Sequence, residues 1–301
     1  MSILFCEHQT PKGVIAEICF DKPSTLNAVD ESMSQSLFYA LENWTQDHRV
    51  RLIVIRSKTQ AAFSAGADLK VLLAQKQVEV AASDDFILRQ YKIIRLLRNT
   101  SMPVLVMANS ITMGFAAGLF MAAKYRICAP DIRFAMPECA IGFFPDVGAA
   151  KFLHIFGDDL ADFIISQAGS IGISALTQAG VIDGVFAFED FGRCLEQIIE
   201  NAGELPKFEA WAANAESFPR SANTSNYAVA ISRRLYKLAL TLSYDELTKI
   251  EYGLARYLLF SADFDLGLNA FLEKRAAVWN KNTAIITDDF ILSLGKHELF
   301  A

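Results

Sequence analysis

Short apolar runs and helix-period patterns alternate through the first half of the chain. Met33, Leu37, Leu41 and Trp44 recur at helical spacing and predict a helix over 31–47, with Asp30 as its N-cap. Further helices are predicted over 83–98 and 114–124. Five runs are short, apolar or rich in β-branched residues, and therefore predict strands: 13–21, 51–57, 103–109, 125–130 and 132–136. This alternation predicts an α/β layered core.

After residue 150 the pattern becomes helical. The stretch "SALTQAG" predicts a short helix with Ser174 as N-cap and Gly180 at its end. The polar stretch "RSANTSNY" (220–227) predicts a loop. Helical periodicity covers 188–202, 222–241, 244–259 and 263–278. We therefore expect one domain, with a core over residues 1–185 and a helical C-terminal region over 186–301 packed on it.

Composition narrows the class of protein. The 301 residues are 52% hydrophobic and 21% charged, which is typical of a globular protein. No window holds eighteen uninterrupted apolar residues, so no membrane partner is expected. The N-terminus lacks a basic segment before its apolar run, and we expect a cytoplasmic protein. The net charge of −6, without a run of Lys or Arg, argues against nucleic acid as a partner.

The cysteines and histidines predict neither a disulfide framework nor a metal site. Five cysteines are odd in number and include no CxxC pair, so buried reduced thiols are expected. The four histidines are scattered along the chain, and no zinc or iron cluster is predicted. The cysteines are Cys6, Cys19, Cys128, Cys139 and Cys194.

Two segments join strand-like runs to helices through small residues. In "AFSAGADLK" (62–70) a ligand could approach the main chain, although a plain turn with Asp68 as N-cap explains the stretch equally well. In "NSITMGFAAGLF" (109–120), Gly114 and Gly118 favour close helix packing, and exposure of the first amides to a ligand is the alternative. Two convergent backbone amides would make an oxyanion hole.

The segment "PECAIGFFPDVG" (137–148) carries two acids through an apolar stretch. Asp146 follows Pro145 and fits the N-cap of a helix. Glu138 has no such explanation, because a carboxylate in apolar surroundings must be paired, protonated or functional.

Together these segments resemble the crotonase (enoyl-CoA hydratase/isomerase) superfamily. The motifs are "DKPSTLNAVD" (21–30), "FSAGADL" (63–69) and "MPVLVMANSITMGFAAGL" (102–119), and the resemblance covers about residues 10–185. The stretch "FAMPECAIGFFPDVGAAKFL" (134–153) looks most like the 3-hydroxyisobutyryl-CoA hydrolase family, and residues 244–280 match its tail more weakly. The resemblance implies an α/β (α+β) crotonase-type spiral of ββα repeats with a helical C-terminal region. It also implies an acyl-CoA substrate, no cofactor beyond the coenzyme A of that substrate, and a homo-oligomer, either trimer or hexamer.

The resemblance also assigns roles to individual residues. The backbone amides of Ala67 and Phe115 would form the oxyanion hole, and Glu138 would act as nucleophile or general base with Asp146 beside it. Gly118 stands where hydratases carry a glutamate, and Asp146 where they usually carry glycine, a pattern that favours hydrolysis. The implied substrate-binding residues are Ala65, Asp68, Leu69, Gln90, Gly114 and Gly118. Lys22, Lys70 and Lys151 are basic candidates for the coenzyme A phosphates.

Several positions depart from the family pattern. Phe115 replaces a glycine at the second oxyanion donor, and Arg89 and Gln90 replace an acidic pair before Tyr91. Leu266 and Asn269 replace an acid and an arginine near the C-terminus. These changes imply an altered acyl specificity in a short-chain acyl-CoA thioester hydrolase. The alternatives are a hydratase, isomerase or decarboxylase on the same fold, or a catalytically impaired relative that binds CoA esters.

Overall fold

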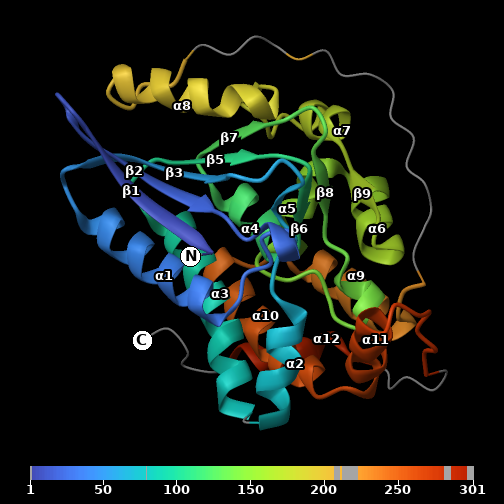
Figure 1. Cartoon of the computed structure of the whole chain (residues 1–301). Helices are drawn as coiled ribbons and strands as arrows, with labels where there is room; N and C mark the ends of the chain where they lie inside the picture. The colour runs from blue at the N-terminus through green and yellow to red at the C-terminus, as the bar shows by residue number, and fades with distance from the viewer. Residues whose placement is uncertain (1, 79, 207–210, 212–222, 281–285, 297–301) are drawn as a thin grey trace. The chain divides into compact units, whose positions relative to one another are not determined.

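The computed structural model of the chain describes residues 2–78, 80–206, 211, 223–280 and 286–296 (Figure 1). The predicted α/β (α+β) class is confirmed, with two sheets and many helices. The chain divides into two compact units. Unit 1 contains Met1–Asp68, Lys92–Phe134 and Ile171–Glu216, and unit 2 contains Leu69–Tyr91, Ala135–Ser170 and Ser217–Ala301. The predicted boundary after residue 185 stays a prediction.

A six-stranded sheet forms the centre of unit 1, with strand order β1-β2-β3-β5-β7-β10. The strand pair β1/β2 is antiparallel, whereas the pairs from β2 to β10 are parallel. Seven of the eight residues of β2 are buried, as expected for a sheet covered on both faces. The strands are β1 (Ile3–Thr10), β2 (Gly13–Phe20), β3 (Val50–Ser57), β5 (Val104–Ala108), β7 (Tyr125–Cys128) and β10 (Gly184–Val185).

Two helices of unit 1 lie against this sheet. Helix α8 (Phe191–Glu200) runs along it in Figure 1, and its buried side chains share a core with Leu52, Val54 and Met107. Helix α1 (Glu31–Gln46) packs near β1, where Trp44 Nε1 donates to Glu7 Oε1 at 2.9 Å. The predicted N-cap is confirmed, because Asp30 Oδ1 accepts from the Met33 amide at 2.9 Å.

A second sheet of four very short strands follows the order β4-β6-β8-β9. Strand β4 leads into the turn Ala65–Asp68, and β6 leads into α4 (Phe115–Ala122). The short sheet therefore positions both small-residue turns. Its strands are β4 (Ala62–Ser64), β6 (Ile111–Met113), β8 (Arg133–Ala135) and β9 (Ser170–Ile171).

Most of unit 2 is helical. Helix α10 coincides with its predicted range and begins with a capping box between Ser243 and Glu246. Helix α3 starts in unit 2 and ends in unit 1. The helices are α2 (Leu69–Val78), α3 (Val80–Asn99), α5 (Ala149–Phe152), α6 (Asp158–Gln167), α9 (Asn226–Leu238), α10 (Tyr244–Leu259), α11 (Ala262–Leu272) and α12 (Asp288–Ser293). None of these helices, within the described ranges, is long and apolar enough to cross a bilayer.

Several predicted boundaries differ from the structure, and α11 ends at Leu272 rather than at residue 278. Helix α7 (Ile173–Gln178) starts after Gly172, so Ser174 is a buried residue inside the helix rather than its N-cap, whereas Gly180 follows its end with a φ of 66°. Of the predicted 220–227 loop, 220–222 lie outside the described residues, and α9 already begins at Asn226. Single-turn 3-10 helices are η1 (Pro23–Thr25), η2 (Glu138–Ile141), η3 (Leu153–Phe156), η4 (Phe188–Asp190) and η5 (Leu294–Lys296).

The segment that carries Glu138 rests on the backbone of α11. Helix η2 ends at Gly142, which has a φ of 74°, and a Cβ there would lie 2.3 Å from the carbonyl oxygen of Asp263. A Cβ at Gly267 would lie 2.4 Å from the carbonyl carbon of Ile141. Only glycine permits both approaches, and the two glycines therefore fix η2 to α11.

Candidate active site

Glu138 is a half-buried acid with one oxygen removed from solvent. Oε2 of Glu138 is buried, and no hydrogen-bond partner for it exists in the described part of the chain. Loss of hydration raises the pKa of Glu138 well above its usual range, and the negative charge of Asp146 raises it further. Buried polar atoms are nearly always satisfied in folded proteins, so this oxygen makes Glu138 a candidate for contact with a ligand or water.

Asp146 has a different environment. Its Oδ2 accepts a 3.0 Å hydrogen bond from the hydroxyl of Tyr91, which is 1% exposed. Burial raises the pKa of Asp146 to about 7, while the bond from Tyr91 lowers it. The prediction that Asp146 caps a helix is wrong: the turn continues through Val147, and Gly148 occupies the N-cap of α5.

The segment that carries Glu138 is well packed. Phe143 lies 5.0 Å from Phe144 and 5.5 Å from Phe264, measured between ring centroids. The next residue after Glu138, Cys139, is fully buried, and its Sγ lies 3.4 Å from Ser232 Oγ. Burial of the two carboxyl groups removes water that would otherwise stabilise their ionised forms.

In unit 1, the predicted oxyanion-hole amides lie in adjacent turns. A Cβ at Gly66 would come within 2.7 Å of Met113 O and 3.3 Å of the Phe115 amide nitrogen. The turn before Ala67 therefore lies directly against the start of α4. Gly66 itself has a φ of 91°, which favours glycine.

The amides of Ala67 and Phe115 remain available for a ligand. The neighbouring Ala65 and Asp68 amides donate to Leu26 O and Val29 O, both at 2.9 Å. Across the described residues, no acceptor is found for the amide of Ala67 or of Phe115. Phe115 is the first residue of α4, where an amide has no partner within the helix.

The other predicted site residues lie either near the two small-residue turns of unit 1 or in unit 2, which holds Glu138 and Asp146. Gly114, with a φ of 57°, caps α4, and Gly118 is buried within it. Asp68 accepts from Lys22 Nζ at 3.2 Å. In unit 2, Leu69 begins α2 and Gln90 is buried on α3. The structure thus brings Ala65–Asp68 together with Gly114–Phe115, and separately joins Glu138 with Asp146.

Two of the basic candidates for coenzyme A phosphates have protein partners. Lys22 also donates to Asp30 at 2.8 Å, and Lys151 donates to the main-chain oxygen of Leu242. Neither lysine is therefore an uncommitted cation, and Lys70, which lies exposed on α2, also interacts with another group of the protein.

Tyr91 contacts the acid pair but was not singled out by the sequence as a site residue. Its spacing with Ile87 and Ile94 on α3 is the ordinary pattern of a buried helix face. No local signal distinguishes such a tyrosine from core, because its partner Asp146 is 55 residues away.

A group of metal-ligand residues occurs in unit 1, contrary to the sequence prediction. Ligand atoms of Cys6, His8 and Glu17 lie within 4.8 Å of one another on the β1/β2 pair. Glu17 Oε2 lies 2.7 Å from His8 Nε2, and Glu17 Oε1 accepts from Arg56 Nε at 2.7 Å. Because Arg56 already balances the charge of Glu17, we assign the group no metal role.

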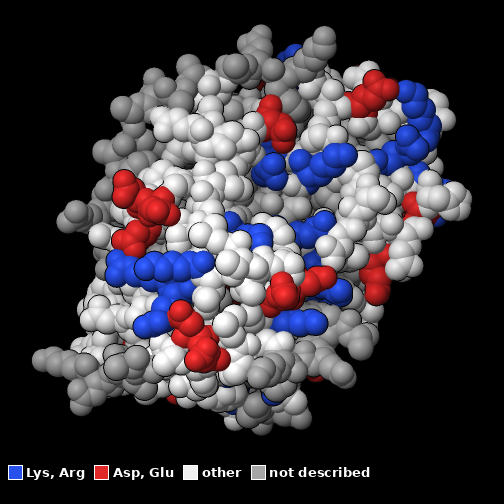
Figure 2. Space-filling view, turned by 180° about the vertical axis from the view of Figure 1, so that it is seen from behind, with Lys and Arg blue, Asp and Glu red and all other residues white. Residues whose placement is uncertain are grey.

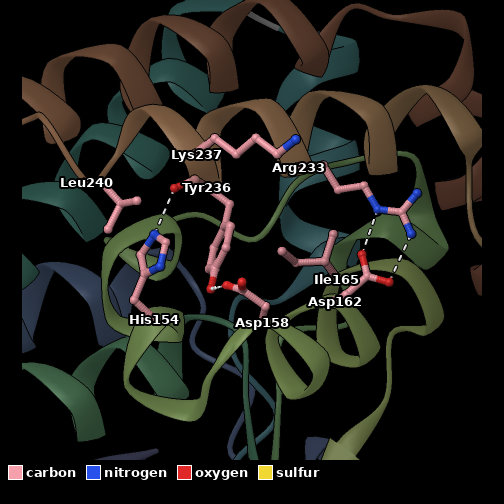
Figure 3. A pocket seen from close by; sticks show the side chains of 8 residues that line it. All are labelled: His154, Asp158, Asp162, Ile165, Arg233, Tyr236, Lys237 and Leu240. Atoms are coloured by element: carbon pink, nitrogen blue, oxygen red, sulfur yellow. Dashed lines mark hydrogen bonds and ion pairs between the residues drawn. The ribbon is translucent and has the colours of Figure 1, made fainter.

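A cavity of about 400 Å³ opens between α6, η3 and α9 in unit 2 (Figure 3). His154 stacks on Tyr236 with ring centroids 3.7 Å apart, and Arg233 binds both oxygens of Asp162 at 2.6 and 2.9 Å. Its lining comprises His154, Asp158, Asp162, Ile165, Arg233, Tyr236, Lys237 and Leu240. Neither acid of the candidate site lines this cavity, and we do not include it in the active site.

Charged side chains of both signs are interspersed on the face shown in Figure 2. Among the described residues of that face, no uninterrupted surface of one sign is seen.

The chain is similar to several known proteins. The chain is 28% identical over 188 residues to the mitochondrial 3-hydroxyisobutyryl-CoA hydrolase of Bos taurus, with 62% of this chain and 49% of that protein covered. It is 25% identical to the Xenopus laevis protein of that name, with 96% and 89% covered. The match thus spans about half of the bovine relative.

A solved structure described as an enoyl-CoA hydratase from Rhodobacter sphaeroides superposes with a TM-score of 0.83 at 21% identity. The alignment covers 98% of this chain and 97% of that one. This likeness confirms the predicted crotonase fold. The sequence profile described as "Enoyl-CoA hydratase/isomerase" matches residues 15–220. The chain therefore belongs to the enoyl-CoA hydratase/isomerase family.

Proposed function

We propose that this protein hydrolyses a short-chain acyl-CoA thioester, as a 3-hydroxyisobutyryl-CoA hydrolase does. The observation that carries the proposal is the Glu138/Asp146 pair, in which the buried Oε2 of Glu138 lacks a partner among the described residues. The glycine at position 118, where hydratases carry a second glutamate, supports hydrolysis rather than hydration. Relatives described as 3-hydroxyisobutyryl-CoA hydrolases support the same reaction class.

The amides of Ala67 and Phe115 would stabilise the negative charge that develops on the thioester oxygen. Each preorganised donor of this kind contributes about 3 kcal/mol to lowering the barrier. For this role, neither amide can be hydrogen-bonded to another group of the protein. No such bond is found within the described ranges. Because a backbone amide donates whatever its side chain, Phe115 can replace the family glycine as a donor.

Glu138 would supply the nucleophile or the base. In the first route, a carboxylate oxygen of Glu138 attacks the thioester carbon, the C–S bond breaks, and water then cleaves the resulting anhydride. In the second route, Glu138 removes a proton from the water that attacks the thioester directly. Its raised pKa makes the ionised form a stronger base in either route.

Asp146 would exchange a proton with the departing thiolate or the attacking water. With a pKa of about 7, it is present in both protonation states near neutral pH. A group so poised can donate and accept a proton without a large free-energy cost.

The test is release of free thiol from a panel of acyl-CoAs that includes 3-hydroxyisobutyryl, 3-hydroxypropionyl and crotonyl esters. The wild type should release thiol from at least one short-chain ester. Glu138→Gln should lose at least about 10²-fold in turnover, the lower range for a positioned acid or base. Glu196→Gln, an exposed residue of α8, serves as the matched control and should keep wild-type turnover.

Three results would contradict the proposal. Hydration of crotonyl-CoA without thiol release would indicate a hydratase. Binding of acyl-CoA without turnover would indicate a catalytically impaired relative. Full thiol release by Glu138→Gln would remove Glu138 from the mechanism.

If thiol is released, a single turnover in H₂¹⁸O separates the nucleophile route from the general-base route. The ¹⁸O label enters the Glu138 peptide only when water cleaves an anhydride at the Glu138 carbonyl.

A further inference from the structure

The turn after Asp146 has a strained backbone. Val147 has a φ of 51° and Gly148 a φ of 91°, so two successive residues lie in the left-handed region. A β-branched residue is rarely found there, and such conformations cost about 1–3 kcal/mol each. The turn persists only if neighbouring groups hold it in place.

The group that holds it is a fully buried carboxylate on α10. The Gly148 amide donates to Glu251 Oε2 at 2.7 Å, and Glu251 is 0% exposed. A hydrogen bond from an amide to a carboxylate is short and strong, and it ties the left-handed turn to the helix. Burial of a carboxyl group is costly, so its presence at this position calls for an explanation beyond packing.

Helix α10 also supports the hydroxyl that binds Asp146. Tyr252, the residue after Glu251, packs edge-on against Tyr91 with 5.9 Å between ring centroids. Tyr252 donates to Asp84 Oδ1 at 2.8 Å, and Arg256 Nε lies 3.0 Å from the same oxygen. One turn of α10 therefore contacts both the backbone after Asp146 and the tyrosine that donates to its carboxylate.

We propose that Glu251 is a positioning residue that fixes Asp146 beside Glu138 by holding the Val147–Gly148 turn in its left-handed conformation. The geometry itself is independent of any reaction, whereas its effect on turnover rests on the proposed hydrolase function. Loss of the Glu251 acceptor lets the turn relax and moves the Asp146 carboxylate away from Tyr91 and Glu138.

The charged and titratable groups around this turn are few. Burial raises the pKa of Tyr91 most, followed by the charges of Asp146 and Glu251, which places all three in one electrostatic neighbourhood. Asp84 and Arg256 flank it through Tyr252. Glu251 does not contribute directly to the raised pKa values of Glu138 and Asp146, which arise from burial and, for Glu138, from the charge of Asp146. A change at Glu251 is therefore expected to register on these titrations only through the position of the turn.

The test is a ¹³C NMR titration of protein labelled at the Asp and Glu carboxyl carbons, with Glu138→Gln and Asp146→Asn to assign the two resonances. It needs no substrate, and it therefore stays decisive even if the wild type hydrolyses no thioester. Glu251→Gln keeps a side-chain oxygen that can accept from the Gly148 amide, so the titration midpoints of Glu138 and Asp146 should not change. Glu251→Leu should move the midpoints of Glu138 and Asp146 toward their ordinary values.

A second comparison covers the case in which Glu251→Leu does not fold. Glu251→Asp keeps a carboxyl group, but its side chain is one methylene too short to reach the Gly148 amide. The titrations of Glu138 and Asp146 should therefore stay closer to wild type in Glu251→Gln than in Glu251→Asp. Where thioester hydrolysis is measurable, turnover should fall at least tenfold in the Asp variant and less than threefold in the Gln variant. The KM should change little in either.

A control separates positioning from general stability. Asp263 is also a buried acid of unit 2, and its side chain accepts from Ser225 Oγ. Asp263→Asn should lower the melting temperature without moving either carboxyl titration. If the Leu and Asp variants of Glu251 behave in the same way, with lower stability and unchanged titrations, Glu251 is a structural residue and the proposal is wrong. An Asp variant that preserves the titrations better than Gln also overturns it.

Discussion

The hydroxyl of Tyr91 donates to Asp146 Oδ2, whereas Oε2 of Glu138 receives no such bond from the described residues. A donor favours the carboxylate over the acid, so the bond from Tyr91 lowers the pKa of Asp146, whereas burial and the charge of Asp146 raise the pKa of Glu138 well above its usual range. Because burial outweighs that bond, the pKa of Asp146 is about 7, and its protonation changes near neutral pH. This asymmetry makes the pair sensitive to pH.

Removal of the tyrosine hydroxyl should weaken that asymmetry. In Tyr91→Phe the pKa of Asp146 should rise, because the hydrogen bond that lowers it is gone. Hydrogen bonds to charged groups contribute about 1.5–3 kcal/mol, and hydrolysis should therefore fall roughly 10- to 100-fold. The measurement is a carboxyl titration together with turnover. An unchanged Asp146 midpoint would show that the bond does not tune this acid.

The pH dependence of hydrolysis should follow Glu138. Turnover requires its ionised form and should rise with pH through the pKa of Glu138. In Asp146→Asn the like charge that helps raise this pKa is absent, so the rising limb should move to lower pH even if the maximum rate falls. Rate profiles of wild type and variant, with Glu196→Gln as control, check this. If the rising limb of the rate profile does not move in Asp146→Asn, that limb reports the ionisation of a group other than Glu138.

Stability should depend on pH through Asp146. Its folded pKa of about 7 lies above the unfolded value of about 3.9, so folding binds a proton between these limits. The resulting stabilisation is complete below about pH 4 and is lost as pH rises through about 7, with an upper limit on the order of 4 kcal/mol. Urea unfolding at pH 5 and pH 8 should show a smaller difference for Asp146→Asn than for wild type. Equal differences would contradict the raised pKa.

The contact between η2 and α11 can be tested with two glycines of positive φ. Gly142→Ala places a Cβ 2.3 Å from Asp263 O, whereas Gly180 has a φ of 66° and no atom within 4 Å of its Cβ. Both variants carry the cost of an alanine at positive φ, on the order of 1 kcal/mol, and only the first adds a clash of about 1–3 kcal/mol. The free energy of unfolding should therefore fall further for Gly142→Ala. Equal losses would show that α11 yields to the extra methyl group.

The two turns that carry the proposed oxyanion-hole amides allow a similar comparison in unit 1. Gly66→Ala would crowd Met113 O and the Phe115 amide, whereas Gly180, with a φ of 66°, has open space around its Cβ. Thioester hydrolysis should drop by about 10²-fold or more in Gly66→Ala, the effect of one lost oxyanion donor, and remain near wild type in Gly180→Ala. Comparable turnover in both would indicate that the first turn is not part of the reacting site.

Long periodic segments were predictable, and very short ones were not. The pattern over 244–259 spans more than four helical turns and begins with a capping box, so α10 matches its prediction. Strands β4 and β6 have three residues each, too few for alternation to show, and their residues were taken as parts of turns.

The candidate site was predictable only where the chemistry is local. Glu138 stands out as an acid in an apolar run, whereas Tyr91 and Glu251 lie on helices with the spacing of buried faces. Their partners are 55 and 103 residues away, and local pattern carries no information about such pairs. The cap predicted at Asp146 was wrong because the left-handed Val147 and Gly148 delay the start of α5.

The contacts around Asp146 can form only in a certain order while the chain is being synthesised. Tyr91, Asp146 and Glu251 are contributed by the early, middle and late parts of the chain. While a ribosome is still translating the first half of α10, the Gly148 amide has no Glu251 carboxyl group to bind. A nascent chain that has completed the whole central sheet therefore still lacks this contact, and the surroundings of Asp146 are completed only after Glu251 has been made.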